Sequence, residues 1–468
     1  MTNNRPLSLV LVSREYPPFF GGGIGTYARW IVPALADAGV RVHVITETAD
    51  RTHPRIETHG RVTTHREPLA IGRGGWTGAA MRFSIHAGRR VTELARRGEA
   101  DVVEFAECEA AGAALLALRH ARSTPRVPTL VHLHTPSEQL FKLRSLAATE
   151  ADPSLATYFV AERLAMRWAD RIGAPSRFIA EWAQAHYGFD ETPAVIPLAV
   201  APLPALSAPP REPNVLFIGR IEPRKGIEPL ILAWKRVLAQ HPSAVLRLAG
   251  ADSAGAPDGG SLRAYLNGLL DDHERNSVRF LGRLNADALR EEYRAAALCV
   301  VPSLWENFPN TCIESMSHGR AVLVSDHGGM TEMIGDTNAG ERFATGDVDD
   351  LAYKLSSMLS EGVERLTERG AVARDRIASL CDPRRVAEQR IALFHETIER
   401  ARARRAPGPA AATLEHWRQA ERALAGDVAD LDLPEPKPAI ARWVDAGAGA
   451  LTSGAVASVA AASGAMTP

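Results

Sequence analysis

Two glutamates eight positions apart, Glu306 and Glu314, are the residues of this chain best suited to bind a polar ligand. The apolar run 298–302 predicts a buried strand, and Glu306 follows it on a loop. Asn310 or Thr311 is suited to cap a helix whose first turn holds Glu314. Free N–H groups at such a helix start attract anions, so a phosphate fits between the two carboxylates. A nucleotide-sugar diphosphate has this layout, with hydroxyl-rich groups on both sides of the phosphates. The simpler interpretation is a pair of capping or salt-bridging glutamates.

Two cations, Arg220 and Lys225, follow a second predicted buried strand at 214–219. Cations on a short turn suit a diphosphate leaving group, because negative charge grows there as a glycosidic bond breaks. Arginine offers a planar fork and lysine a point charge, which match non-equivalent phosphate oxygens. The alternative is a solvated turn, and this is how we interpret the neighbouring Arg224.

A glycine-rich segment, G-G-G-I-G at 21–25, lies between a predicted strand at 7–12 and a predicted helix at 28–38. Glycines let a backbone approach a ligand, and the start of the following helix favours anions, so Gly22 and Gly23 are candidate binding residues. A tight turn is the plain alternative. A dinucleotide site is another, although the spacing is not G-x-G-x-x-G and only Glu47 is placed to bind a ribose.

His132 and His134 alternate with Leu133 on a predicted strand at 129–134, so both point to the same face of the sheet. His134 lies at the carboxyl end of that strand, where α/β folds bind their ligands. A histidine on a strand can also be buried with its hydrogen bonds satisfied, which is the alternative for either residue.

The elements that must position these residues alternate between strands and helices, which predicts parallel, doubly wound sheets. At 468 residues the chain is too long for one ordinary core. We predict four parts, in chain order: an N-terminal Rossmann-like domain at 1–200, a proline-rich linker at 201–213, a C-terminal Rossmann-like domain at 214–384, and, after a helix at 385–405, a low-complexity tail at 406–468 that is poorly ordered or peripheral.

Composition is that of a soluble α/β protein, with 46% hydrophobic and 23% charged residues. A net charge of −1 gives no reason to expect a nucleic-acid partner. The four cysteines show no C-x-x-C pairing and there is no signal-peptide or membrane-spanning pattern, which predicts a cytoplasmic protein. Basic pairs at 89–90 and 96–97 favour a solvated helix face, and they also allow peripheral contact with the inner face of an anionic membrane.

Six motifs occur in one order along the chain: G-G-G-I-G, V-H-L-H-T-P, F-I-G-R-I-E-P-R-K-G, V-R-F-L-G, the E-x7-E segment and H-G-G-M-T-E-M-I. Over about residues 7 to 400 the chain resembles the family 4 retaining glycosyltransferases. The resemblance implies the GT-B fold, in which two Rossmann-like domains face each other across a cleft. It also implies that the helix at 385–405 crosses back onto the first domain.

The resemblance further implies roles for individual residues. His134 matches the histidine that contacts the transferred sugar, and Gly23 matches the glycine that faces the donor diphosphate. Arg220 and Lys225 match the diphosphate-binding pair. The remaining matches lie in the E-x7-E segment: Glu306 at the sugar hydroxyls, Glu314 at the ribose, and the backbone of Phe308, Pro309, Asn310 and Thr311 at the sugar and phosphates. Many members carry glycine where this chain has Pro309, so one N–H donor is missing there. Segment 278–282 is expected to line the base pocket through backbone groups.

The expected reaction is transfer of a sugar from a nucleotide sugar, with a UDP-sugar favoured and GDP-mannose next, to an unidentified hydroxyl. Front-face displacement with retention is implied, without a metal or a resident cofactor, because the cations and helix N-termini balance the diphosphate charge. The acceptor is a glycan, a lipid-linked glycan or a small molecule. Three alternatives remain open: a non-catalytic sugar-nucleotide-binding partner of another transferase, an NAD-dependent oxidoreductase and a sugar-nucleotide epimerase.

Overall fold

A computed structural model describes residues 5–19, 22–48, 55–68, 75–120, 126–144, 153–201, 203, 206 and 212–403. The predicted tail at 406–468, Gly21 and most of the proline-rich segment at 201–213 lie outside the described residues. The chain divides into two compact units. The N-terminal unit comprises Met1–Pro175, Ala180–Ala199 and the chain from Pro383 onward, and the C-terminal unit comprises Ser176–Ile179 and Val200–Asp382.

The described strands of the N-terminal unit form one eight-stranded sheet in the order β3-β4-β2-β1-β5-β6-β7-β8. Its pairs are parallel except for β3 and β4, which are antiparallel. The strands are β1 Ser8–Val12, β2 Arg41–Thr48, β3 Ile56–His59, β4 Val62–Pro68, β5 Val102–Ala106, β6 Thr129–His132, β7 Arg171–Ala174 and β8 Ala194–Val195.

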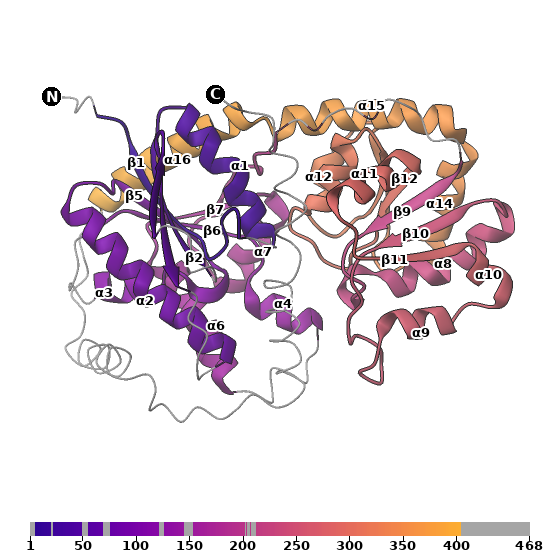
Figure 1. Ribbon diagram of the computed structural model, residues 1–468, viewed down its shortest axis with the longest axis horizontal. Helices are drawn as coiled ribbons and strands as arrows, with labels where there is room; N and C mark the ends of the chain where they lie inside the picture. Colours follow the sequence, from indigo (N-terminus) through magenta and orange to yellow (C-terminus); the bar gives the residue numbers. More distant parts are fainter. Residues whose placement is uncertain are drawn as a thin grey trace. The chain divides into compact units, whose positions relative to one another are not determined.

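Helices of the N-terminal unit cover both faces of this sheet (Figure 1). They are α1 Gly23–Asp37, α2 Gly75–Arg96, α3 Ala113–His120, α4 Ser137–Arg144, α6 Pro153–Trp168, α7 Arg177–Tyr187 (which belongs to this unit from Ala180 onward) and α16 Pro383–Ala403. The strand order reverses direction at β1, so right-handed crossovers place α1 and α3 on opposite faces. Helix α3 packs against α2 and α6, whereas α1 packs against α16.

The last described helix, α16, is fixed to the N-terminal unit by a buried charged residue. Arg390 is 1% exposed, and it pairs with Glu104 of β5 and donates a hydrogen bond to the Tyr27 hydroxyl at 2.8 Å. Tyr27 in turn donates to Glu104. A charged strand residue can be buried here because its carboxylate pairs with the Arg390 guanidinium and accepts a hydrogen bond from the Tyr27 hydroxyl.

The C-terminal unit contains one parallel six-stranded sheet in the order β11-β10-β9-β12-β13-β14. Its strands are β9 Asn214–Ile218, β10 Val245–Ala249, β11 Val278–Gly282, β12 Ala296–Val301, β13 Ala321–Ser325 and β14 Gly340–Phe343. Its helices are α8 Ile227–Gln240, α9 Leu262–Gly268, α10 Asp272–Asn276, α11 Ala286–Ala295, α12 Asn310–Ser317, α13 Met330–Ile334, α14 Val348–Ser360 and α15 Gly362–Leu380.

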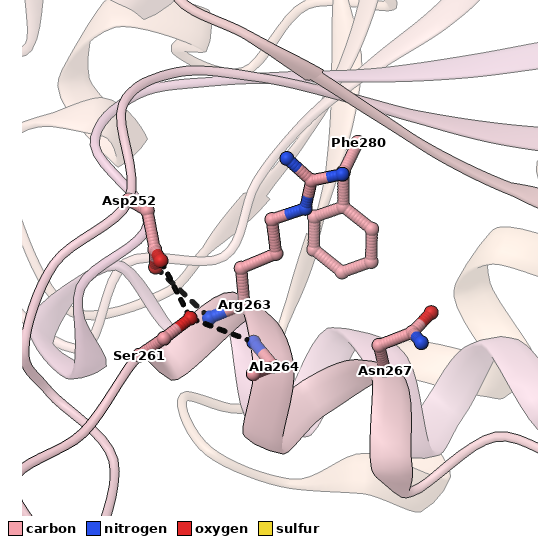
Figure 2. A pocket seen from close by; sticks show the side chains of 6 residues that line it. All are labelled: Asp252, Ser261, Arg263, Ala264, Asn267 and Phe280. Atoms are coloured by element: carbon pink, nitrogen blue, oxygen red, sulfur yellow. Dashed lines mark hydrogen bonds between the residues drawn. The ribbon is translucent and has the colours of Figure 1, made fainter.

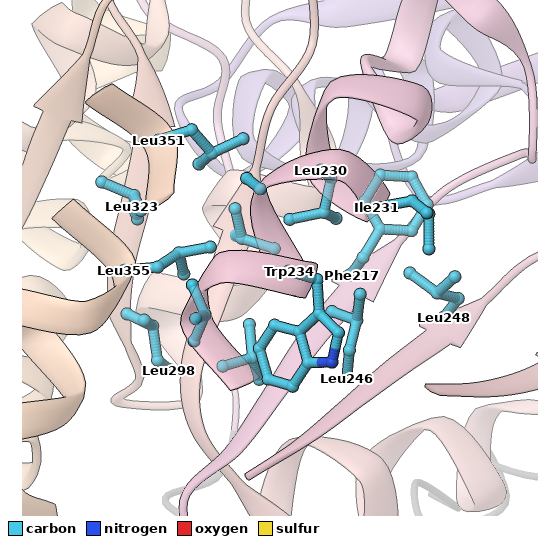
Figure 3. Close-up of a cluster of buried hydrophobic side chains, with 14 of the residues drawn as sticks. Phe217, Leu230, Ile231, Trp234, Leu246, Leu248, Leu298, Leu323, Leu351 and Leu355 are labelled. Carbon is cyan, nitrogen blue, oxygen red and sulfur yellow. The ribbon is translucent and has the colours of Figure 1, made fainter. Parts of the chain in front are cut away.

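A core of aliphatic side chains around Trp234 holds α8 and α14 against this sheet (Figure 3). Trp234 is fully buried and donates its indole N–H to the Ser277 hydroxyl at 2.9 Å, so its one polar atom is satisfied. The labelled neighbours come from β9, β10, β12 and β13 as well as from both helices. The strands that carry the candidate site loops, β9 and β12, are therefore fixed by a packed layer beneath them.

The predicted strands occur within one or two residues of their expected bounds, with two differences that affect the candidate site. Helix α1 begins at Gly23 and not at residue 28, so Gly23 lies in a helical turn. Strand β6 ends at His132, so His134 lies two residues beyond it and not on the strand end. The sequence analysis did not predict the hairpin of β3 and β4, whose strands are mostly polar.

Candidate functional site

The predicted diphosphate-binding lysine and the first glutamate of the E-x7-E segment are in direct contact. Lys225 donates a charge-assisted hydrogen bond to Glu306, and Arg224 donates to the same carboxylate oxygen at 2.9 Å. Arg224 also pairs with Glu222 at 2.8 Å, and its side chain is only 11% exposed. The interpretation of Arg224 as a solvated cation was therefore wrong, because two carboxylates draw its guanidinium inward.

The backbone that presents Lys225 is a 3₁₀ turn at Pro223–Lys225, closed by Gly226 in the left-handed region at φ 67°. A Cβ at Gly226 would collide with the carbonyl oxygen of Pro302, just beyond β12. Only glycine satisfies both the backbone conformation and this close approach. The loops that follow β9 and β12 are thereby held together, which brings Lys225 to Glu306.

Arg220, the second predicted cation, is placed differently. Its side chain is 49% exposed and lies 3.7 Å from Glu222, beyond good hydrogen-bond distance. It follows β9 at the carboxyl edge of the sheet. An exposed guanidinium at this edge can reach a bound anion without first breaking a short internal ion pair.

The Glu306 carboxylate is ionised despite its burial. Burial by itself would raise the pKa of Glu306, but the cations Lys225 and Arg224 outweigh that effect and lower the pKa below its ordinary value. Its backbone is fixed by a parallel bridge to Gly328 and by the Gly329 N–H, which donates to the Glu306 carbonyl at 3.1 Å. A Cβ at Gly329 would collide with the carbonyl oxygen of Asn307.

Helix α12 follows this loop, as predicted, but its first residues differ from the expectation. The N-cap is Pro309, and no side chain caps the helix, because Asn310 and Thr311 already belong to its first turn. Glu314 therefore lies in the second turn and not in the first. The first N–H groups of a helix have no partner within the helix, so the backbone of α12 still offers donors to an anion.

Glu314 is half-buried, and its carboxylate accepts a hydrogen bond from the Tyr293 hydroxyl at 3.1 Å. Burial raises the pKa of Glu314, while the bond from Tyr293 partly opposes that shift. The rings of Tyr293 and His318 also pack in a tilted arrangement with their centroids 4.5 Å apart, which restrains the phenol. Tyr293 is a functional candidate without a sequence signal, since one tyrosine on a helix rich in charged residues forms no recognisable motif.

A cavity of about 370 Å³ lies at the β11 edge of the same unit (Figure 2). Phe280 lines it from β11, within the segment predicted to form the base pocket, and the Arg263 guanidinium lies 5.5 Å above the Phe280 ring. Asp252 accepts hydrogen bonds from the Ser261 hydroxyl at 2.6 Å and from the Arg263 N–H at 2.9 Å. These hydrogen bonds connect three of the residues that line the cavity and so hold its rim in place.

The remaining candidate residues, Gly22, Gly23 and His134, belong to the N-terminal unit. Gly22 is the N-cap of α1, and its N–H donates to Glu15 Oε2 at 2.8 Å. The predicted anion-binding start of this helix thus holds a carboxylate of the chain itself, which the sequence analysis did not foresee. Gly23, in the first turn, is exposed.

His132 and His134 lie on one side of the chain, as predicted, with ring centroids 4.9 Å apart. Both rings pack against the Tyr27 ring, with centroid distances of 5.0 Å for His132 and 5.1 Å for His134. His132 is buried, whereas His134 is half-buried. Burial, together with the charge of Arg390, lowers the pKa of His134 to about 3, so its imidazole is neutral and can both donate and accept a hydrogen bond.

Within the described ranges, no three histidine, cysteine, aspartate or glutamate side chains gather closely enough to share a metal ion. None of the described helices is long and apolar enough to cross a bilayer. Metal independence and the location of the protein in the cell stay predictions.

Comparison with known proteins matches the two halves of the chain to two family models. Residues 21–202 match the model described as Glycosyltransferase Family 4, and residues 204–376 match the model described as Glycosyl transferases group 1. Together the matches span most of both units. The chain therefore belongs to the family 4 glycosyltransferases and has the GT-B fold, a class of enzymes that transfer a sugar from a nucleotide sugar.

Individual relatives are distant. The chain is 35% identical to an uncharacterized glycosyltransferase of Methanocaldococcus jannaschii over 32% of its own length and about a third (36%) of that protein. It is 27% identical to the phosphatidyl-myo-inositol mannosyltransferase of Mycolicibacterium smegmatis over 73% of this chain and 82% of the relative. Among solved structures, sucrose-phosphate synthase from Thermosynechococcus elongatus superposes with a TM-score of 0.67 at 24% identity, covering 84% of this chain and 99% of that one.

Proposed function

We propose that this protein is a retaining glycosyltransferase that transfers a hexose from a UDP-sugar to a hydroxyl acceptor by front-face displacement. The observation that carries the proposal is the contact between Lys225 and Glu306. Lys225 is a cation suited to a diphosphate, and Glu306 is an ionised carboxylate suited to sugar hydroxyls. The two side chains meet at the carboxyl edge of a parallel sheet. A sugar diphosphate needs both groups at that spacing.

Each residue then has a defined part in the reaction. Lys225 and the exposed Arg220 stabilise the charge that grows on the leaving diphosphate, so no resident cofactor or metal is required. Glu306 accepts hydrogen bonds from the sugar hydroxyls, and Glu314 accepts them from the ribose. The N–H groups of Phe308, Asn310 and Thr311 serve the sugar and phosphates. Pro309 has no N–H and only shapes the loop.

In the N-terminal unit, neutral His134 donates a hydrogen bond to a hydroxyl of the transferred sugar, and the backbone of Gly22 and Gly23 faces the diphosphate. The acceptor hydroxyl is the nucleophile, and the departing phosphate accepts its proton. No enzyme carboxylate forms a bond to the sugar. Catalysis rests on positioning and on charge stabilisation.

Uridine is the favoured base, and GDP-mannose is the second candidate donor because one relative is a mannosyltransferase. The acceptor is a glycan, a lipid-linked glycan or a small molecule. The basic residues of α2 make a membrane-bound acceptor accessible through peripheral contact, although Arg90 is already paired with Glu67 and Glu93.

The experiment uses water as the acceptor, because the natural acceptor hydroxyl is not identified. UDP-α-glucose, UDP-α-galactose and GDP-α-mannose are each incubated with the protein, and the released sugar is followed by proton NMR before it mutarotates. We expect one donor to be consumed and the α-anomer to appear first. A β-anomer as the first product contradicts retention, and no consumption of any donor, with no binding of them either, favours a different activity.

A further inference from the structure

Glu107 is a buried carboxylate that the proposed chemistry does not use. It follows β5 directly, has no exposed surface, and lies beside the loop that carries His134. Burial raises the pKa of Glu107 to about 7, and the backbone N–H groups of His134, Cys108 and Thr135 oppose the shift. A carboxylate in such a place costs stability unless its oxygens are well satisfied.

The Glu107 carboxylate directly holds the backbone of His134. The backbone N–H of His134 donates to both carboxylate oxygens, at 2.9 Å and 2.8 Å. The Glu107 N–H in turn donates to the His132 carbonyl at 3.4 Å. Because β6 ends at His132, strand pairing does not hold the backbone of His134. The hydrogen bonds from the His134 N–H to the Glu107 carboxylate hold it instead.

A second buried glutamate, Glu162 of α6, provides a natural comparison. It is 1% exposed and accepts hydrogen bonds from the N–H groups of Glu109 at 2.8 Å and Ser137 at 3.0 Å. It thus holds the same two loops, but no described hydrogen bond joins it to His134. The two glutamates are alike in burial and chemistry and differ in whether His134 is the residue held.

We infer that Glu107 is a positioning residue for His134: its carboxylate fixes the backbone from which the imidazole reaches the transferred sugar. The inference rests on the proposed role of His134 as the sugar contact. Glutamine at position 107 keeps the volume but turns one acceptor oxygen into an NH₂ donor, which faces backbone N–H groups. The loop must then shift, and a small misplacement of a sugar-contacting group weakens binding and reaction.

The test measures how much the sugar adds to nucleotide affinity. Isothermal titration calorimetry gives the dissociation constants of UDP and UDP-glucose, and their ratio reports the contribution of the sugar. GDP and GDP-mannose form the second pair. The proteins are wild type, Glu107→Gln, His134→Ala, the double variant and the matched control Glu162→Gln. Thermal unfolding of each variant records its stability.

We expect His134→Ala to lower the ratio by about three- to tenfold, as for loss of one hydrogen bond. Glu107→Gln should lower it by a similar factor, and the double variant by no more than the larger single effect, since both changes remove the same contact. Glu162→Gln should leave the ratio within about twofold of wild type even where its stability falls as much as that of Glu107→Gln.

Three outcomes overturn the inference, and they are distinguishable. An unchanged ratio in Glu107→Gln, when His134→Ala lowers it, means that Glu107 does not position His134. Independent effects that multiply in the double variant mean that Glu107 acts elsewhere. If wild type binds neither pair, or His134→Ala leaves the ratio unchanged, the proposed role of His134 fails and the inference fails with it.

Discussion

Lys225 and Glu306, 81 positions apart in the chain, form a charge-assisted hydrogen bond at the carboxyl edge of the C-terminal sheet. Gly226 makes this contact feasible, because the turn that carries Lys225 packs against the backbone carbonyl of Pro302, four residues before Glu306. The two groups predicted to bind the diphosphate and the sugar are therefore held in one rigid loop cluster, together with Arg224.

Substitution of the two arginines should separate a ligand-binding role from a structural one. Arg220→Ala should lower UDP affinity about tenfold or more, because a hydrogen bond to a charged group is lost. Its stability should change by less than about 0.5 kcal/mol, because the side chain is half-exposed. Arg224→Ala should lower the free energy of unfolding by about 3 kcal/mol, because it leaves two carboxylates with one cation fewer. Urea unfolding and calorimetry with UDP measure both quantities. If Arg224→Ala is as stable as the wild type, the structural role of Arg224 is contradicted.

The turn glycine should be indispensable for a reason beyond its backbone conformation. Gly226 and Gly188 have nearly the same φ, 67° and 65°, but a Cβ meets nothing within 4 Å at Gly188. Gly188→Ala should cost about 1 kcal/mol, the strain of the left-handed region alone. Gly226→Ala should cost clearly more and should also weaken UDP binding, since the clash displaces Lys225. Equal losses of stability in the two variants, with UDP affinity intact, are the result that speaks against this account.

The ion pair between Arg390 and Glu104 should govern how firmly α16 is attached. Arg390→Met leaves Glu104 buried without its cation and should lower the free energy of unfolding by about 3–5 kcal/mol. Adding Glu104→Gln removes the stranded charge, so the double variant should recover part of the loss. Chemical denaturation of the four proteins measures this coupling. If the losses of unfolding free energy caused by the two single substitutions simply add in the double variant, Arg390 and Glu104 are not coupled.

Stability should fall in mild acid because of the buried pair His43 and His65, whose rings hydrogen-bond at 3.1 Å. Burial, together with His43, lowers the pKa of His65 from 6.5 to about 4. The unfolded chain therefore takes up a proton below pH 6.5 that the folded chain takes up only near pH 4. The resulting loss is at most about 2 kcal/mol at pH 5. Replacing His65 by Gln should flatten the profile between pH 6.5 and 4, whereas replacing His59, with its 78% exposed side chain, should not. Parallel profiles for wild type and His65→Gln contradict this assignment.

The architecture could be predicted from the sequence because a buried parallel strand consists of a run of apolar residues. Val10 and Leu298 lie in such runs, and both strands occur within two residues of their predicted bounds. Strands made mostly of polar residues have no such signature, which is why β3 and β4 were not predicted. Helix starts were also placed wrongly at α1 and α12, where glycine or proline stands at the N-cap and no side chain caps the helix.

The candidate site was predictable where a motif places chemistry at the end of a strand, as for Lys225 and Glu306. Neighbouring residues of identical charge are a different matter. Arg220 and Arg224 look alike in sequence, and only the carboxylates of Glu222 and Glu306, one of them far along the chain, decide which side chain is drawn inward. Glu107 and Tyr293 contact residues that lie 21 or more positions away in the chain, and no local pattern reports such contacts.

The measurement that tests the central claim most directly is thermal unfolding with UDP, GDP, ADP and NAD in turn, for wild type and Glu314→Ala. A ligand at about a hundred times its dissociation constant stabilises the fold by roughly 2.7 kcal/mol, which shifts the midpoint measurably. The account predicts a shift with one nucleoside diphosphate, UDP first, and its loss in Glu314→Ala. A shift with NAD alone, or a nucleotide shift that persists unchanged in Glu314→Ala, contradicts it.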